Sequence, residues 1–238
     1  MAASGKIDDS PPGSSPSRAA RLRRSAVVDL RNLLAERFPH TPASAETRLI
    51  TGLSFLDQTI GRGLPKGAIT ELISPQVSAG SASLIHALLH AAHRDRYFLA
   101  LIDGRDSFDP QPLGNACLRH LLWVRCNKVF EAIKAADLLL RDGNFPLVIV
   151  DLVLNPPEEL RKIPQTSWYR LQRLVEPISA VCLVLTRQSM VGSAQLKIVL
   201  ENFWTLETFE KDNAISRLRF HIQRSHLSCL ESAIAGVS

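Results

Sequence analysis

Short apolar runs alternate with helical patterns over most of the chain after Arg48. Five runs, rich in Val, Ile and Leu, have the length of buried parallel strands: residues 68–74, 97–103, 121–126, 146–153 and 180–187. Helical patterns lie between them, at residues 83–93, 129–141 and 166–175. This alternation predicts an α/β fold, with an open and mostly parallel sheet flanked by helices on both faces.

Residues 215–224 instead alternate between apolar and polar positions, which is typical of an antiparallel edge strand. We expect Leu218, Phe220 and Ile222 to point inward. The opposite face then carries Arg217, Arg219, His221 and Gln223. With Arg224 these side chains would form a positive ridge, which serves either as a contact surface for a partner or DNA, or as a guard of the sheet edge against unwanted pairing.

The N-terminal part has a different pattern. Residues 1–17 are rich in Ser, Pro and Gly and are predicted to be a disordered tail. Residues 18–38 have an apolar stripe and a basic face, so residues 18–47 are expected to form an amphipathic basic helix and a linker. The helix could pack on the main domain or dock on another chain. The core domain is expected at residues 48–226, followed by a tail at 227–238.

Composition adds mild constraints. The 238 residues are 45% hydrophobic and 21% charged, with a net charge of +5, which permits an acidic partner without requiring one. The four cysteines show no close pairing and no metal-type spacing, and no apolar run approaches the length of a membrane span. We therefore expect a cytoplasmic protein that contacts no membrane and holds no metal.

The stretch SPQVSAGSASL, residues 74–84, follows the first predicted strand, where α/β sheets commonly bind ligands. A working phosphate loop needs glycines, a Lys that reaches the phosphates, and a hydroxyl that holds Mg²⁺. Here Pro75 stands where the first glycine is expected. If Gly80 is the second glycine, Ser81 takes the position of the lysine and Ala82 that of the hydroxyl. The pattern predicts a degenerate nucleotide site.

Two longer segments, TGLSFLDQTIGRGLPKGAITELISP (residues 51–75) and FLALIDGRDSFDP (residues 98–110), occur in the order found in the RecA ATPase core. The chain resembles that family over residues 48–224. Within the superfamily, the missing lysine is similar to the pattern of ImuA-type proteins, which are accessory factors of damage-inducible mutagenesis. The ending LLAERFP of the N-terminal helix also resembles that group.

The resemblance assigns roles to three further positions. Arg105 stands where active members carry the glutamate that prepares water for attack. Asp151 closes an apolar strand in the position of the residue that helps to place Mg²⁺, although any buried strand ending in Asp matches this pattern. Gln188 matches the polar sensor position. We therefore expect no ATPase activity, no catalytic residue and no cofactor.

A basic segment, residues 155–177, corresponds in position to a loop through which RecA-like proteins approach single-stranded DNA. Its positive residues are Arg161, Lys162, Arg170 and Arg173. Trp168 or Tyr169 could add a stacking face, or Trp168 could be buried. The second such loop falls at residues 189–193 and is short, so DNA contact would be weak and salt-sensitive.

The function implied by the resemblance is that of a non-catalytic accessory protein in DNA repair, the SOS response and translesion synthesis. Its implied partners are a RecA filament and an error-prone polymerase complex, which would place it with the nucleoid. Two alternatives stay open: an atypical ATP-binding recombination ATPase, and an autonomous single-stranded DNA-binding protein. The histidines at 86, 90 and 93 have helical spacing, but without a Glu motif or Cys pair they favour a solvated helix surface over a zinc site.

Overall fold

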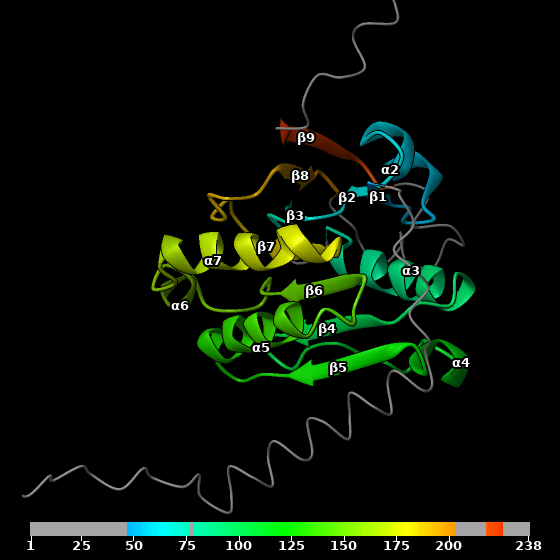
Figure 1. Cartoon of the computed structure of the whole chain (residues 1–238), viewed down its shortest axis with the longest axis horizontal. Coiled ribbons are helices and arrows are strands. Elements are labelled where there is room, and N and C mark those ends of the chain that lie inside the picture. Colours follow the sequence, from blue (N-terminus) through cyan, green and yellow to red (C-terminus); the bar gives the residue numbers. More distant parts are fainter. Residues whose placement is uncertain (1–46, 77–78, 203–217, 226–238) are drawn as a thin grey trace, which may run out of the picture. The chain divides into compact units, whose positions relative to one another are not determined.

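The computed structural model describes residues 47–76, 79–202 and 218–225, which build one seven-stranded sheet (Figure 1). Across the sheet the strands are β5 (Leu121–Arg125), β4 (Leu99–Asp103), β6 (Leu147–Asp151), β7 (Val181–Thr186), β3 (Ala68–Ile73), β8 (Leu196–Leu200) and β9 (Phe220–Ser225). All neighbours are parallel except β8 and β9. Every residue of β3, β4 and β7 is buried, because helices cover both faces of these central strands.

Helices cover the two faces with separate cores. One core is formed with α2 (Ser54–Thr59), α3 (Ser81–Arg94) and α4 (Asn115–Leu118). The other is formed with α5 (Val129–Asp142), α6 (Pro157–Leu160) and α7 (Gln165–Val175), which runs into the 3₁₀ turn η1 (Glu176–Ile178). Trp168 and Leu171 of α7 are fully buried on this second face. The predicted α/β fold, with a mostly parallel sheet and an antiparallel pair at one end, is confirmed.

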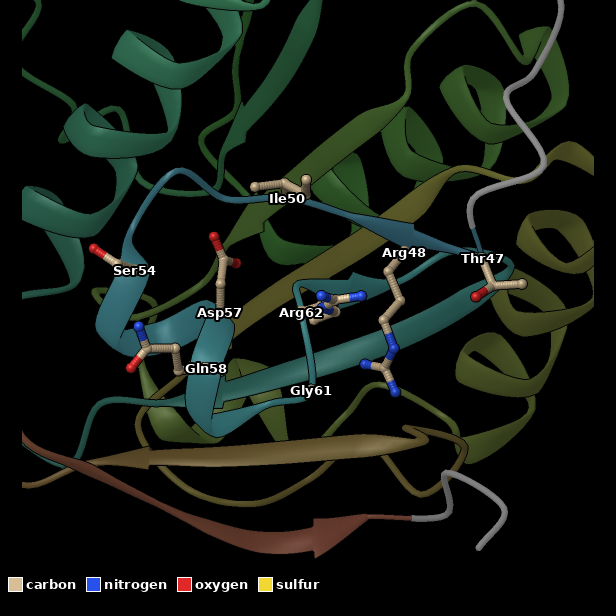
Figure 2. A pocket seen from close by; sticks show the side chains of 8 residues that line it. All are labelled: Thr47, Arg48, Ile50, Ser54, Asp57, Gln58, Gly61 and Arg62. Atoms are coloured by element: carbon tan, nitrogen blue, oxygen red, sulfur yellow. The ribbon is translucent and has the colours of Figure 1, made fainter. Parts of the chain in front are cut away.

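A small antiparallel pair, β1 (Arg48–Leu49) and β2 (Leu64–Pro65), precedes the main sheet. The turn between them depends on Gly63, which has a φ of +116° and packs so closely on Leu49 that a Cβ would lie 2.7 Å from the Leu49 carbonyl carbon. Together with α2, this turn encloses an open pocket of about 650 Å³ (Figure 2).

The five predicted parallel strands are all present, with ends shifted by at most two residues. The sequence reading did not identify β8, which pairs with β3 on one side and with β9 on the other. The predicted tails, the basic helix at residues 18–38 and Arg217 lie outside the described residues. No helix in the described part of the chain has the length and apolarity to cross a bilayer.

Phe220 and Ile222 of β9 lie on one face of the strand, as expected, since they pair with the buried Leu200 and Ile198. Leu218 is buried and Phe220 is partly buried, but Ile222 is 37% exposed, because β9 is the edge strand of the sheet. A register shift leaves Gln223 as an extra residue of β9 between Ile222 and Arg224, so the alternation changes only after Ile222.

Candidate functional site

The loop after β3 lies at the edge where the parallel strands end. The Ser74 amide donates to the Thr186 carbonyl (2.7 Å), and its hydroxyl donates to the Gln76 carbonyl (3.0 Å). Gly80 has a φ of +98° and ends the loop at the first residue of α3, Ser81, which is 6% exposed. Pro75 and Ala82 are exposed. No residue of the described part of this loop is charged, so nothing there resembles the lysine of a phosphate loop.

Asn202 ties this loop to the C-terminal strand. Its side-chain amide donates to the carbonyls of Ala79 (3.2 Å) and Arg219 (3.3 Å), and its side-chain oxygen accepts the amide of Arg219 (2.9 Å). Asn202 is 7% exposed, so these bonds are formed away from solvent. The loop after β3 is therefore held in place by backbone groups, the Ser74 hydroxyl and the Asn202 amide, with a long contact from Arg187 to the Pro75 carbonyl (3.5 Å).

Asp151 ends β6 directly beside Asp103 at the end of β4. Burial raises the pKa of the Asp151 carboxyl to about 6, and the nearby charge of Asp103 acts in the same direction. Its only side-chain hydrogen bond within the described residues is from the Val153 amide (3.0 Å), which favours the charged form. The surroundings of Asp151, the residue that the resemblance matches to the magnesium position, therefore disfavour the charged form of its carboxyl group.

Arg105, at the position of the catalytic glutamate, is exposed and belongs to a tight turn built on Asp103. The carboxylate of Asp103 accepts the amides of Arg105 (3.2 Å), Ser107 (2.8 Å) and Phe108 (2.8 Å). Because an aspartate that accepts successive amides fixes the chain direction, Asp103 shapes the loop while Arg105 projects outward. The side-chain amide of Asn155 also donates to the Gly104 carbonyl (2.9 Å), which links this turn to the loop after β6.

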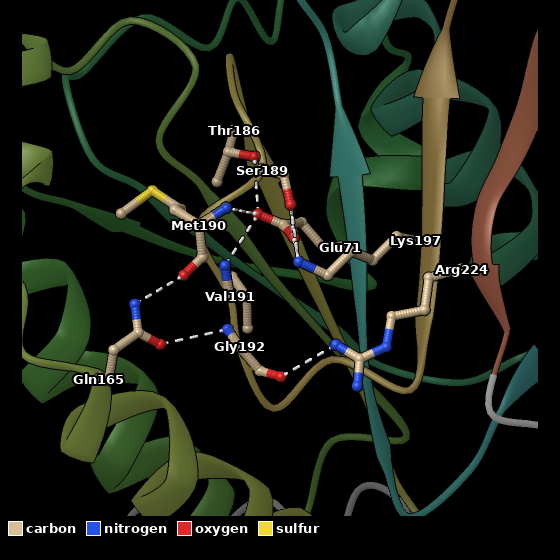
Figure 3. Close-up of polar contacts among 9 residues, drawn as sticks. All are labelled: Glu71, Gln165, Thr186, Ser189, Met190, Val191, Gly192, Lys197 and Arg224. Atoms are coloured by element: carbon tan, nitrogen blue, oxygen red, sulfur yellow. Dashed lines mark hydrogen bonds and ion pairs between the residues drawn. The ribbon is translucent and has the colours of Figure 1, made fainter.

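The loop after β7 is organised around a buried ion pair (Figure 3). Lys197 of β8 and Glu71 of β3 face each other in register, with 2.7 Å between the ammonium and a carboxylate oxygen. The other oxygen of Glu71 accepts the amides of Met190 (2.7 Å) and Val191 (3.1 Å). Lys197 also donates to the Ser189 hydroxyl (2.7 Å). The Glu71 side chain is fully buried and that of Lys197 is 8% exposed.

Two more contacts hold the same loop from outside the ion pair. Gln165 at the start of α7 donates to the Met190 carbonyl (3.0 Å) and accepts the Gly192 amide (3.3 Å), while Arg224 of β9 contacts the Gly192 carbonyl (3.4 Å) (Figure 3). Gln188, the residue at the sensor position, is exposed and its side chain makes no hydrogen bond with the described residues. The loop is thus braced by α7, β3, β8 and β9.

The basic residues predicted to contact DNA differ in their surroundings. Arg170 binds both carboxylate oxygens of Asp137 (2.6 and 3.2 Å), which also pairs with Arg141 (2.8 Å), so the charge of Arg170 is only partly compensated. Arg161, Lys162 and Arg173 are exposed and form no ion pair within the described residues, and Arg219 at the start of the β9 segment is exposed too. These four side chains remain available for an acidic partner.

Of the two aromatic candidates for stacking, Trp168 is fully buried in the second core, so its use as a stacking face is excluded. Tyr169 is 54% exposed. The histidines of α3 also gain no metal-binding role, because no group of three or more His, Cys, Asp or Glu side chains in the described ranges could hold a metal ion.

Reasoning from sequence did not assign roles to Asp103, Glu71 and Lys197. A signal was present for the last two, since each places a charge inside an otherwise apolar strand, AITELI and LKIVL. A buried charge needs a partner of opposite charge. Two strands of one sheet that each carry one such residue could therefore be predicted to lie side by side.

Comparison with known proteins gives partial matches to RecA, and no family model matches the chain. RecA of Clavibacter michiganensis subsp. michiganensis is 34% identical over 107 residues, which is 43% of this chain and 29% of that protein. RecA of Chlorobaculum tepidum is 26% identical over 155 residues, 58% of this chain and 44% of that protein. RecA of Chlorobaculum parvum is 32% identical over 116 residues.

The aligned part thus spans less than half of these RecA proteins. The architecture of the described residues agrees with the sequence likeness to RecA. The sheet is mostly parallel, has helices on both faces and carries an antiparallel pair at one end. The chain is similar to RecA proteins, and together these findings support placing its core in the RecA-like superfamily.

Proposed function

We propose that this chain is a non-catalytic, RecA-like accessory protein of DNA repair that serves SOS mutagenesis and translesion synthesis through contacts with other proteins. The observation that carries the proposal is the loop after β3, whose described residues contain no cation. RecA similarity supports the link with DNA repair and recombination.

The chemistry argues against ATP hydrolysis. Ser81 and Ala82 begin α3 where a phosphate loop would present its lysine and its magnesium-binding hydroxyl, and Pro75 removes one backbone donor. Arg105 cannot take a proton from water. Without charge stabilisation and a positioned nucleophile, phosphoryl transfer loses both of its main sources of acceleration.

The partners proposed for this role are a RecA filament, an error-prone polymerase complex, or both, and association with the nucleoid would follow. The family resemblance supports them. The braced loop at Ser189–Gly192 also fits this role, because a rigid loop offers a binding surface with a low entropic cost of ordering.

A second candidate function is weak binding of single-stranded DNA. It is favoured by the exposed ring of Tyr169 on α7, together with Arg161, Lys162 and Arg173, which have no ion-pair partner within the described residues. Aromatic stacking combined with phosphate contacts is the usual basis of such binding. Three contacts imply a modest affinity that falls steeply with added salt.

The test of the main proposal is thermal unfolding of the full chain with and without ATP and Mg²⁺. Ligands that bind the folded state raise the melting temperature by mass action, so even modest affinity is detectable at millimolar ATP. We expect no shift and no release of phosphate. An ATP-dependent rise in melting temperature that Asp151→Ala abolishes would instead support the atypical ATPase.

A further inference from the structure

A pocket lies between β1, α2 and the turn before β2, and its lining includes no residue of the loops that follow β3 and β7. It has a volume of about 650 Å³, and its lining includes Arg48, Ile50, Ser54, Asp57, Gln58 and Arg62 (Figure 2). Figure 2 shows Arg48, Gly61 and Arg62 at the pocket, and the polar side chains of Ser54, Asp57 and Gln58 on α2. The pocket therefore combines two guanidinium groups with one carboxylate.

Arg48 is fixed by the protein in one orientation. Its Nη1 donates to the carbonyls of Ile60 (2.8 Å) and Gly63 (3.0 Å). Gly61 lies against the guanidinium, at a position where a Cβ would be 3.4 Å from Nη2. Two carbonyl bonds hold the group without neutralising it, and its remaining edge, Nε with Nη2, forms no hydrogen bond within the described residues.

That edge is the one through which arginines of this protein bind carboxylates. Nε and Nη2 contact both oxygens of a carboxylate in the pairs Arg94–Asp95, Arg125–Asp106 and Arg170–Asp137. Such two-point contacts are stronger and more directional than single bonds. Arg48 presents the same edge, held in advance by Ile60 and Gly63, and partly buried in the pocket.

Arg62 is the second cation of the pocket, and its backbone conformation is strained. Its φ of +69° is uncommon for a residue with a side chain, and its amide donates to the Asp57 carbonyl (2.6 Å). The exposed guanidinium has no bonding partner within the described residues. A residue kept in a costly conformation while its side chain is free points to use of that side chain, since glycine would fit the turn better.

The charge balance selects the ligand. Asp57 also lines the pocket, and its carboxylate accepts the Thr51 amide (3.0 Å), the Thr51 hydroxyl (2.8 Å) and the Gly52 amide (3.1 Å). Two cations and one anion leave a net charge of +1, which one carboxylate neutralises, whereas a phosphate dianion would leave a net charge of −1 in the pocket. The side chain of Ile50, 51% exposed at the pocket, offers apolar contact beside that charge.

We propose that this pocket binds a segment of a partner protein in which an apolar residue directly precedes an acidic one. The acidic side chain is held by the free edge of Arg48 and by Arg62, and the apolar side chain packs on Ile50. This inference rests on the proposed function, in which the protein acts by binding other proteins. The pocket would be one of the surfaces that bind them.

The test measures binding of a capped, fluorescent peptide, Lys-Ile-Asp-Asp-Ser, to the full chain by anisotropy at low salt. A peptide with both Asp replaced by Asn should bind at least about tenfold more weakly, because it lacks the charge that a bidentate contact requires. Arg62→Gly should weaken binding about five- to tenfold while relieving the strained turn. Arg48→Lys should have an effect at least as large, because an ammonium cannot make the two-point contact.

Arg96→Gly is the matched control. Arg96 is also an exposed arginine with positive φ (+56°), and it does not line the pocket, so this variant changes charge and backbone strain equally. Affinity within about twofold of the wild type is expected, whereas an equal loss in both variants would show a non-specific charge effect and overturn the proposal.

Two other occupants give distinct outcomes. The peptide repeats residues 6–10 of the chain, so binding seen only after Asp8→Asn with Asp9→Asn would show that the chain's own segment fills the pocket, and would contradict the partner. Displacement of the peptide by a ten-nucleotide oligo-dT, sensitive to Arg62→Gly, would assign the pocket to nucleic acid. Neither result depends on the ATP test, so failure here is distinguishable from failure of the proposed function.

Discussion

The loops that follow β3 and β7 leave the same edge of the sheet and are stabilised in different ways. In its described residues the first has no charged side chain of its own and is held by backbone bonds, by Asn202 and by a long contact from Arg187 to the Pro75 carbonyl (3.5 Å). The second is anchored on the fully buried Glu71 and its ion pair with Lys197. In this protein the buried charge near the edge therefore lies beneath the second loop, while the cation that contacts the first loop, Arg187, is exposed.

The difference shows which of the two loops depends on a specific charge pair. The first loop holds no buried charge, so a substitution there leaves no buried ion without its partner. Glu71 is different, since its carboxylate accepts two amides of the Ser189–Gly192 turn, the Thr186 hydroxyl and the Lys197 ammonium, all in the interior of the protein. Buried charges that lose their partner are among the costliest defects in a protein.

The largest effect is expected from separating this pair. Lys197→Met should lower the free energy of unfolding by about 3–5 kcal/mol, because Glu71 is left as a buried charge without its cation. The double variant Glu71→Gln with Lys197→Met should lose less than the sum of the two single variants, by at least about 1 kcal/mol. Urea unfolding of the four proteins measures this coupling.

The exposed pair Arg94–Asp95 is the control, since its side chains are 54% and 40% exposed and such pairs contribute little. Arg94→Met should therefore cost far less than Lys197→Met. If Lys197→Met lost less than about 1 kcal/mol, the buried pair would not be what holds the second loop.

This comparison also shows what the sequence could predict. The strands were visible because each is a short, largely apolar run, and four of them are buried in the sheet while the edge strand β5 is half-buried. The degenerate phosphate loop stays a prediction that rests on the residue identities at Ser81 and Ala82. The pairing of Glu71 with Lys197 was not visible, because it depends on β8 being inserted beside β3, and β8 was not identified. The bulge at Gln223 was not visible for a similar reason, since alternation alone does not show an extra residue in one strand.

A smaller effect is expected where the turn after β4 meets the loop after β6. A Cβ on Gly104 would lie 2.7 Å from the Asp151 carbonyl oxygen, and it would also meet the buried side chain of Asn155. Gly104→Ala should cost about 1–3 kcal/mol, because backbone cannot move aside as a flexible side chain would. Gly114→Ala is the control, since a Cβ there meets nothing within 4 Å. Equal stability of the two variants in urea would contradict the predicted clash.

The next effect is a pH dependence at Asp151. Its pKa in the folded protein, about 6, is above the ordinary value of 3.8, so the folded state favours the protonated acid. The contribution of this group to stability is full below about pH 4 and is lost as the pH rises through 6. Relative to Asp151→Asn, the wild type should therefore lose about 1–2 kcal/mol between pH 4 and pH 7.5.

Asp106→Asn is a control of opposite sign, because the hydrogen bond from Arg125 lowers the pKa of Asp106. In the wild type, the Asp106 carboxylate should stabilise the folded state increasingly as the pH rises through the ordinary pKa of 3.8. Unfolding in urea at five pH values separates the two trends. A wild-type stability that rises with pH relative to Asp151→Asn would show that Mg²⁺ or a neighbouring cation stabilises the Asp151 carboxylate, which would revive a metal role at this position.

The smallest effect is expected at the start of the C-terminal strand, where the first loop is attached. Asn202 binds the backbone of Arg219, so the guanidinium of Arg219 takes no part in that attachment and stays exposed. Charge reversal by Arg217→Glu with Arg219→Glu should therefore change the free energy of unfolding by no more than about 0.5 kcal/mol. Asn202→Ala is the contrasting variant, because it leaves the Arg219 amide without its acceptor and should cost about 1–3 kcal/mol.

Binding of the charge-reversed variant to single-stranded DNA and to a polymerase complex, measured at two salt concentrations, then distinguishes a contact surface from protection of the sheet edge. A loss of binding that shrinks as salt is added assigns the ridge to an acidic partner, whereas unchanged binding to both leaves these arginines as protection of the sheet edge.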